Sequence, residues 1–345
     1  MKLIDVNTLK LVDFQTQPSK SYAILSHTWQ TNVTDEVLYS DIRAEGLHGC
    51  PEKPGKFKVM GCCRQAKADG YRYVWIDSCC IDKDSAVELG SAINSMYRWY
   101  NKAAVCYVYM ADVSAGREVL DEGGAFANSR WFQRGWTLQE MLAPPELHFY
   151  NQDWELIAKK EDIINDLENI TGIPRNYIFS FDPATAKASA AQRMSWAAQR
   201  NTTRDEDRAY CLLGLFNVNL PMIYGEGGRN AFVRLQQAIM EKTGDNSILA
   251  WGLGSGRVTT GTNMLPFLPG ATEASSDSSK KSEGIWASEP RDFAHCGNIS
   301  TYATSFTGVC TFASGRIQVD MSLPGLGRSS FRKVTGFLDG NLEVC

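Results

Sequence analysis

The sequence has little that would mark a membrane, secreted or nucleic-acid-binding protein. No stretch of its 345 residues approaches the roughly 18 consecutive apolar residues of a membrane-spanning helix. The N-terminal MKLIDVNTLKLVDF has charges among its apolar residues and lacks the unbroken apolar core of a secretory signal. The formal net charge is −4, and Lys and Arg are not gathered into a basic stripe. We therefore expect a cytoplasmic globular protein without a membrane span or a nucleic-acid partner.

Metal-ligand patterns are also lacking. The chain has only four histidines, and its 10 cysteines include two adjacent pairs, Cys62-Cys63 and Cys79-Cys80, instead of the C-x-x-C spacing of a zinc site. In a cytoplasmic protein such cysteines are reduced thiols and not a disulfide framework. We expect no bound metal and no resident cofactor.

The first half of the chain alternates β-rich and amphipathic segments. Strands are predicted at residues 22–26, 71–77, 104–110 and 147–150, and helices over residues 57–69, 85–100 and around residue 140. This alternation predicts right-handed β-α-β crossovers and an α/β fold with a mainly parallel sheet covered by helices on both faces. We assign residues 1–153 to this domain.

Polar and aromatic residues gather after two of the predicted strands. Ligands of open α/β sheets bind beyond the carboxyl ends of the strands. The residues at these ends are Ser26, His27, Thr28 and Trp29, then Asp77, Ser78, Cys79 and Cys80. Polar residues also form ordinary turns after strands, so turn formation and ligand binding both remain open.

From Trp154 the pattern changes to helices and loops. We expect a helical extension over residues 154–252, and a linker with a small β-rich portion over 253–345, including hairpins at 309–321 and 334–344. The alternating charges of residues 204–208 indicate a solvated or internally paired cluster. The glycines of YGEGGRN at 224–230 indicate a turn, because no Gly-Lys-Ser/Thr follows them.

The stretch RWFQRGWTLQEML at 130–142 contains the carboxylate of greatest interest. Thr137 and Glu140 have the T-x-x-E spacing of a capping box, and Pro144-Pro145 ends the predicted helix. A carboxylate beside aromatic side chains can stabilise a developing positive charge. It can equally do no more than cap its own helix, and the spacing alone favours the cap.

Three segments resemble the fungal heterokaryon incompatibility (HET) domain. They are YAILSHTWQ at 22–30, YVWIDSCCIDKDSAVELGSAINSMYRWY at 73–100 and RGWTLQE at 134–140, in the order of the family. The resemblance extends to about Trp251. It implies a role in fungal non-self recognition, in which the HET domain triggers cell death after incompatible cells fuse. Larger members join it to nucleotide-binding and repeat modules, which we do not find here, so we expect a stand-alone effector or a separate sensor partner.

A shorter resemblance concerns chemistry. RGWTLQEML is similar to the W-C-x-x-E-L block of TIR domains, whose glutamate is catalytic in the NAD-cleaving members, and YAILSHTW is similar to the first TIR strand. The resemblance places Glu140 at the catalytic position, Trp136 at the preceding tryptophan, and Ser26 and His27 at the strand end. Thr137 stands where the block usually has Cys. A TIR-like, flavodoxin-like sheet is implied.

Cleavage of the nicotinamide–ribose bond passes through an oxocarbenium-like state, which a nearby carboxylate stabilises. We therefore take Glu140 as the candidate catalytic residue, NAD as the candidate substrate and self-association as the expected route to activation. The candidate substrate-binding residues are Ser26, His27, Thr28, Trp29, Asp77, Cys80, Arg134 and Trp136. Two alternatives stay open: a non-enzymatic adaptor that signals death by assembly, and a scaffold that binds a nucleotide without turnover.

Overall fold

The computed structural model describes residues 1–15, 21–116, 120–121, 123–252 and 286–299, together with the backbone of four later strands. Its contacts divide the chain into two units. The first comprises residues 1–186, 200–203 and 210–222, and the second comprises residues 187–199, 204–209 and 223–345. Residues 253–285 of the expected linker lie outside the described residues.

The first unit contains a seven-stranded sheet in the order β2-β1-β4-β3-β5-β6-β7. The strands are β1 (Lys2–Asp5), β2 (Lys10–Asp13), β3 (Ala23–His27), β4 (Tyr73–Trp75), β5 (Val105–Tyr109), β6 (Leu147–Tyr150) and β7 (Leu156–Lys159). The central strands β4, β3, β5 and β6 are parallel, and β1, β2 and β7 add antiparallel edges. The predicted parallel α/β core is confirmed, whereas its antiparallel edges were not expected.

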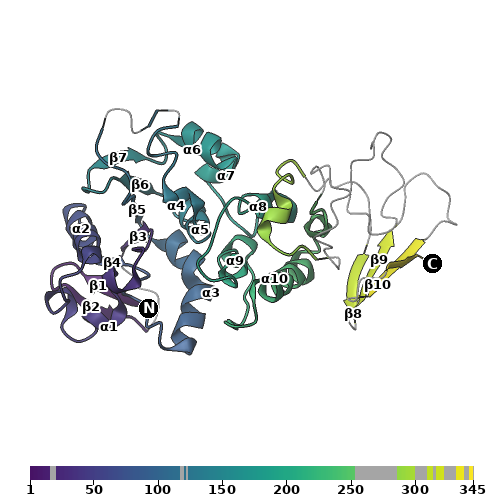
Figure 1. The fold of residues 1–345 in the computed structure, drawn as a ribbon, viewed down its shortest axis with the longest axis horizontal. Coiled ribbons are helices and arrows are strands. Elements are labelled where there is room, and N and C mark those ends of the chain that lie inside the picture. The colour runs from purple at the N-terminus through teal and green to yellow at the C-terminus, as the bar shows by residue number, and fades with distance from the viewer. Residues whose placement is uncertain are drawn as a thin grey trace. The chain divides into compact units, whose positions relative to one another are not determined.

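Helices cover both faces of this sheet. The helices of this part are α1 (Tyr39–Ile42), α2 (Pro54–Ala68), α3 (Ala86–Lys102), α4 (Arg130–Gln133), α5 (Thr137–Leu142), α6 (Ile164–Thr171) and α7 (Arg175–Phe179). Figure 1 shows α2 on one face of the central strands and α3, α4 and α5 on the other. All residues of β3 and β5 are buried, as expected for strands covered on both faces.

The first unit departs from expectation after residue 154. We expected helices and loops there, but β7 pairs antiparallel with β6 before α6 begins. Its sequence LIAK is short, and two of its four residues are exposed, so it lacks the apolar run that identifies the central strands. Pairing with β6 therefore determines this strand more than its own composition does.

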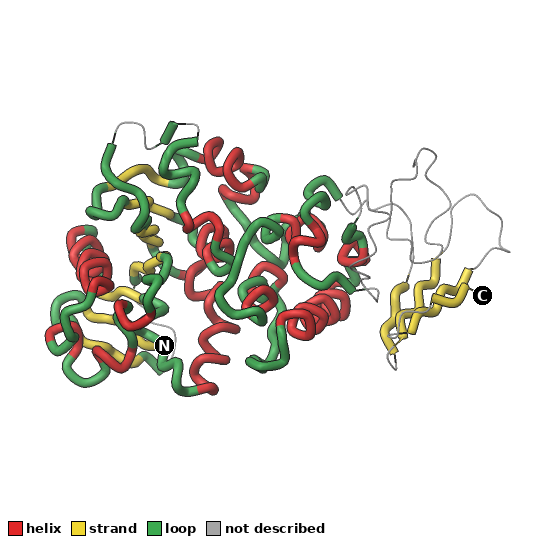
Figure 2. Tube along the Cα trace, viewed as in Figure 1, coloured by secondary structure: helices red, strands yellow, loops and turns green. Residues whose placement is uncertain are grey.

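The second unit is mostly helical in its described part, with a separate four-stranded sheet (Figure 2). Its longest helix is α10 (Gly228–Thr243), and shorter helices are α8 (Ala190–Ser195) and α9 (Asp207–Tyr210), whose last residue belongs to the first unit. The later strands are β8 (Val309–Ala313), β9 (Arg316–Met321), β10 (Arg332–Phe337) and β11 (Leu342–Val344). Antiparallel pairing of β8 with β9 and of β10 with β11 confirms both predicted hairpins.

Three other findings concern the described residues. Eight cysteines are free and buried, in agreement with the expected reduced thiols. In the same part of the chain, no helix combines the length and apolar character needed to cross a membrane. No group of three or more His, Cys, Asp and Glu side chains within the described ranges is arranged to hold a metal ion.

Candidate functional site

Ser26 connects the end of β3 to the helical segment that carries Glu140. Because β3 is a central strand, Ser26 is fully buried. Its hydroxyl donates to Oε2 of Glu140 at 2.5 Å and accepts the indole N–H of Trp131 at 2.7 Å. The predicted proximity of residue 140 to the first strand end is therefore present, across 114 residues of sequence.

The capping-box interpretation of Glu140 is wrong. Trp136 is the N-cap residue of α5, and no side chain caps this helix end. The hydroxyl of Thr137 instead donates toward the carbonyl oxygens of Trp131 and Arg134, at 2.5 and 2.9 Å. Glu140 therefore does not cap the helix, and its carboxyl group faces the end of β3.

Glu140 lies in surroundings that favour its neutral form. The residue is only 6% exposed, and burial, reinforced by the charge of Asp77, raises the pKa of its carboxyl group to about 8. The hydroxyl of Tyr100 hydrogen-bonds Glu140 and also donates to the carbonyl oxygen of Leu25 at 2.9 Å. The hydrogen bonds to Ser26 and Tyr100 and the charge of Arg134 lower the Glu140 pKa, but burial outweighs them. The resting carboxyl group is therefore protonated near neutral pH.

Asp77, after β4, has the opposite character. Burial opposes its ionisation, but the charge of Lys83 and hydrogen bonds from His27 and Trp29 outweigh burial and hold its pKa below the usual range. His27 Nε2 lies 2.8 Å from Oδ1, and Trp29 Nε1 donates to Oδ2 at 3.0 Å. The ammonium of Lys83 lies 4.1 Å from the centre of the Trp29 ring and donates to the Asp77 carbonyl oxygen at 2.6 Å.

The two carboxyl groups form a pair with opposed protonation states. Asp77 is ionised and Glu140 is protonated, and the charge of Asp77 is one of the causes that raise the Glu140 pKa. Such a division of roles between two acids is typical of acid–base and glycoside chemistry. The ring nitrogens of His27 lie 2.8 Å from Asp77 Oδ1 and 3.3 Å from the Thr28 carbonyl oxygen.

Thr28 connects this region to a second buried pair. The ammonium of Lys58 donates to Oε2 of Glu36 at 2.7 Å and to the carbonyl oxygen of Thr28 at 3.2 Å. The backbone N–H of Gln30 donates to the same Glu36 oxygen at 3.0 Å. The loop after β3 is therefore fixed by a buried ion pair beside the candidate site.

The other predicted site residues occupy several environments. Cys80 is buried, and its sulfur accepts the N–H of Ile76 at 3.4 Å within the turn after β4. Arg134 is half-buried, and its charge lowers the Glu140 pKa against the larger effect of burial. Trp136 is half-buried at the start of α5.

Four residues that contact or surround the carboxyl pair were not predicted as site residues. They are Tyr100, Trp131, Lys83 and Arg200. Trp131 stands in the same block as Trp136, and only the fold distinguishes which indole binds Ser26. Arg200 donates to the Thr137 hydroxyl at 2.9 Å and to the Arg134 carbonyl oxygen at 3.0 Å, which joins a distant segment to α5.

The glycine-rich turn before α10 binds the side-chain carboxylate of Glu206. The backbone N–H groups of Gly225 and Gly227 donate to one oxygen of Glu206, at 2.8 and 3.1 Å. Gly227 has φ +83°, a conformation that side chains rarely adopt. The predicted turn is confirmed. Internal pairing of residues 204–208 is confirmed too, since Arg208 binds Asp205 at 3.2 Å.

Comparison with known proteins adds two family matches. Residues 22–123 match the model described as heterokaryon incompatibility protein (HET), and residues 230–311 match a domain of unknown function (DUF8212). The chain is 43% identical over 227 residues to the vegetative incompatibility protein HET-E-1 of Podospora anserina. That match covers 65% of this chain but only 16% of the relative's length. No solved structure matches the chain.

Proposed function

We propose that this chain, a heterokaryon incompatibility (HET) domain protein, is an effector of fungal non-self recognition that triggers cell death by hydrolysing NAD. The observation that carries the proposal is the buried Ser26–Glu140 contact beside ionised Asp77 at the carboxyl ends of β3 and β4. The name of the similar Podospora protein supports the incompatibility role. The opposed protonation states of two acids support hydrolysis of a glycosidic bond.

The strand order supports a TIR-like or flavodoxin-like sheet. The parallel strands lie in the order β4-β3-β5-β6, which corresponds to the order 2-1-3-4 of doubly wound folds. In such folds the ligand lies where the chain switches sides, between the first and third strands. Those strands are β3 and β5 here, and Ser26 pairs in register with Val108 of β5. The contact of Glu140 with Ser26 at this strand end supports Glu140 as the proposed catalytic group.

The proposed reaction begins with a change of protonation at Glu140. The nicotinamide ring of NAD carries a positive charge, and a cation beside a carboxyl group lowers its pKa. Glu140 then loses its proton to solvent and presents an anion to the ribose. The bond between ribose C1′ and the nicotinamide nitrogen breaks, and nicotinamide leaves as a neutral molecule with the bonding electrons.

The remaining steps restore the site. The carboxylate of Glu140 stabilises the oxocarbenium-like ribose while a water molecule attacks C1′. Glu140 takes a proton from that water, which completes ADP-ribose and returns the carboxyl group to its resting form. Asp77 stays ionised throughout and keeps His27, Trp29 and Lys83 in place to bind the rest of the nucleotide.

The low exposure of Glu140 favours a resting chain that is inactive by itself. At 6% exposure, the side chain has too little open surface to meet a ribose without movement of its cover. We propose that self-association, driven by a sensor partner or a sensor module, opens this edge of the sheet. The free, buried thiols support the reducing cytoplasm as the place of action.

An adaptor without enzymatic activity is the second candidate. The observation in its favour is that Glu140 is satisfied inside the fold by Ser26 and Tyr100, as a structural side chain would be. In that case assembly with other chains transmits the death signal. A nucleotide bound without turnover at the same edge is a variant of this candidate.

Release of nicotinamide by the purified chain distinguishes the candidates. The assay compares the wild type with Glu140→Gln over a range of protein concentrations, with Glu52→Gln as control because the Glu52 side chain is 90% exposed. A hydrolase loses at least about a hundredfold in rate with Glu140→Gln, and its specific activity rises with concentration. Toxicity of Glu140→Gln in fungal cells, with no nicotinamide release by the wild type, would instead establish the adaptor.

A further inference from the structure

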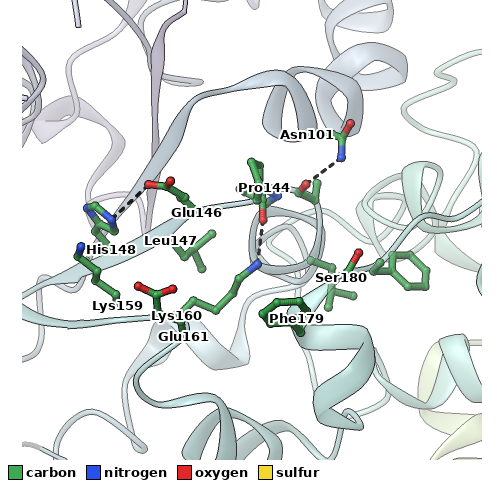
Figure 3. A pocket seen from close by; sticks show the side chains of 14 residues that line it. Asn101, Pro144, Glu146, Leu147, His148, Lys159, Lys160, Glu161, Phe179 and Ser180 are labelled. Atoms are coloured by element: carbon green, nitrogen blue, oxygen red, sulfur yellow. Dashed lines mark hydrogen bonds and ion pairs between the residues drawn. The ribbon is translucent and has the colours of Figure 1, made fainter. Parts of the chain in front are cut away.

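A pocket away from the Glu140 site encloses a buried lysine. The pocket has a volume of about 440 Å³ and lies in the first unit, between the segment that leaves α5, strands β6 and β7, and the segment after α7 (Figure 3). Pockets of this size accommodate small molecules. Its walls include Leu142, Pro144, Leu147, Phe179 and Phe181, and its charged lining residues are Glu146, His148, Lys159, Lys160 and Glu161.

The burial of Lys160 follows from strand alternation. Ala158 is buried, Lys159 is exposed and Lys160 is buried again, as expected when successive side chains point to opposite faces. The backbone N–H of Lys160 donates to the Leu147 carbonyl oxygen at 2.9 Å and extends the pairing of β7 with β6. The backbone therefore directs this ammonium inward although the neighbouring Lys159 has free access to water.

The ammonium of Lys160 has no counter-ion of its own. It donates to the carbonyl oxygen of Pro144 at 2.9 Å, and Figure 3 shows the side chain extending across the pocket to that atom. An ammonium has three donors, so two are left for another group. Within the described part of the chain, no carboxylate forms an ion pair with Lys160. Glu146 lies 3.7 Å from His148 instead.

We propose that this pocket binds a small monocarboxylic acid with an apolar body, whose carboxylate pairs with Lys160. The carboxylate supplies the missing negative charge and accepts the free N–H donors. Phe179, which lines the pocket and is 66% exposed, covers the apolar body. The proposal does not depend on NAD hydrolysis, because Lys160 makes no hydrogen bond to Ser26, Asp77 or Glu140.

A phosphate fits this pocket less well than a carboxylate. Phosphate is a dianion near neutral pH, and Lys160 provides a single buried positive charge. Glu146 and Glu161 line the same pocket, and their negative charges oppose a second charge on the ligand. Lys159 is exposed and His148 has a pKa lowered by burial and by Lys159, so neither adds a buried cation.

Binding of a carboxylate to Lys160 should be accompanied by uptake of a proton. Burial lowers the pKa of Lys160 to about 8, so a large share of the side chain is neutral in mildly alkaline solution. A bound carboxylate raises that pKa again, and binding at about pH 8.5 therefore takes up a proton. A ligand held by apolar contacts alone causes no such uptake.

The test measures binding of phenylacetate and hexanoate to the full chain by calorimetry in two buffers that differ in ionisation enthalpy. Phenylacetamide and inorganic phosphate are the comparison ligands. Lys160→Met removes the charge but keeps the apolar stem, and Lys159→Met is the matched control on the exposed neighbour. We expect Lys160→Met to weaken binding of the acids roughly ten- to hundredfold and to abolish proton uptake, and Lys159→Met to change affinity less than about threefold.

Several outcomes would overturn the proposal. They are absence of saturable binding by both acids, equal binding of phenylacetamide, tighter binding of phosphate, or unchanged affinity in Lys160→Met. Misfolding does not obscure the result, because removal of a buried uncompensated charge favours the folded state. Thermal unfolding of each variant verifies that point.

Discussion

Substitution of Glu140 by Gln is expected to change how the stability of the chain depends on pH. The pKa of this carboxyl group is raised from its ordinary value of 4.5 to about 8 by burial in the folded chain. Because the pKa is raised, the contribution of Glu140 to the free energy of unfolding is complete below about pH 4.5, and it is lost as the pH rises through 8. Glutamine has the shape of the protonated acid and no charge to bury.

The size of the effect follows from the two pKa values. The Glu140 pKa is about 8 in the folded chain and 4.5 in the unfolded chain. When the group is fully ionised, this difference lowers the free energy of unfolding of the wild type by about 5 kcal/mol. Between about pH 5 and pH 8 the wild type loses about 3 kcal/mol of this, and Glu140→Gln loses none of it. Titrating groups distant from residue 140 act equally in both proteins, so the difference between the two curves reports on residue 140 and the groups that its charge affects.

Urea unfolding from pH 5 to pH 8, followed by tryptophan fluorescence, provides the measurement. Trp75 and Trp131 are fully buried in the first unit and contribute to its signal. The Glu52→Gln control, at an exposed ion pair, is expected to follow the wild type within about 0.5 kcal/mol. Parallel pH curves for the wild type and Glu140→Gln would refute the raised pKa and the protonated resting state.

Three further substitutions test the contacts around the site. Asp77→Asn is expected to destabilise the fold by about 2 kcal/mol at pH 7. Because the Asp77 pKa is lowered, ionised Asp77 stabilises the wild type above its pKa, and this contribution is lost in acid. Acid unfolding of the variant should therefore depend less on pH than that of the wild type. Trp131→Phe keeps the aromatic packing but removes the donor to Ser26, at an expected cost of about 1–3 kcal/mol in urea unfolding. Lys58→Met leaves buried Glu36 without its partner and is expected to cost about 3–5 kcal/mol, and a second substitution, Glu36→Gln, should recover much of that loss in thermal unfolding.

The sequence predicts the centre of the sheet better than its edges. Central strands such as AILSH and VCYVY are buried on both faces, so they consist mainly of apolar residues and can be recognised from the sequence alone. The outer strands β1 and β2, with the sequences KLID and KLVD, each have two apolar residues between charged ends, and β1 pairs with β4 some 70 positions away. Short edge strands depend on such distant pairing, which no local pattern contains.

The capping role that the sequence favours for Glu140 is contradicted by the structure. The T-x-x-E spacing indicates a cap, but Thr137 turns back to the carbonyl oxygens of Trp131 and Arg134 and leaves Glu140 free. The contact with Ser26 spans 114 residues, so it depends on the packing of α5 against β3. The resemblance to TIR domains makes Glu140 the candidate catalytic residue, whereas helix-capping rules predicted a capping role that it does not have.

The sequence does not predict the protonation states of Asp77 and Glu140, and these states change the proposed mechanism. Asp77 and Glu140 are both acids near strand ends, yet Lys83, His27 and Trp29 surround the first, whereas burial and a neighbouring negative charge govern the second. A resting anion at Glu140 would attract cations indiscriminately. In the proposed mechanism, Glu140 is neutral until a cationic substrate lies beside it. The chemistry would then depend on the substrate as well as on the self-association proposed to open the site.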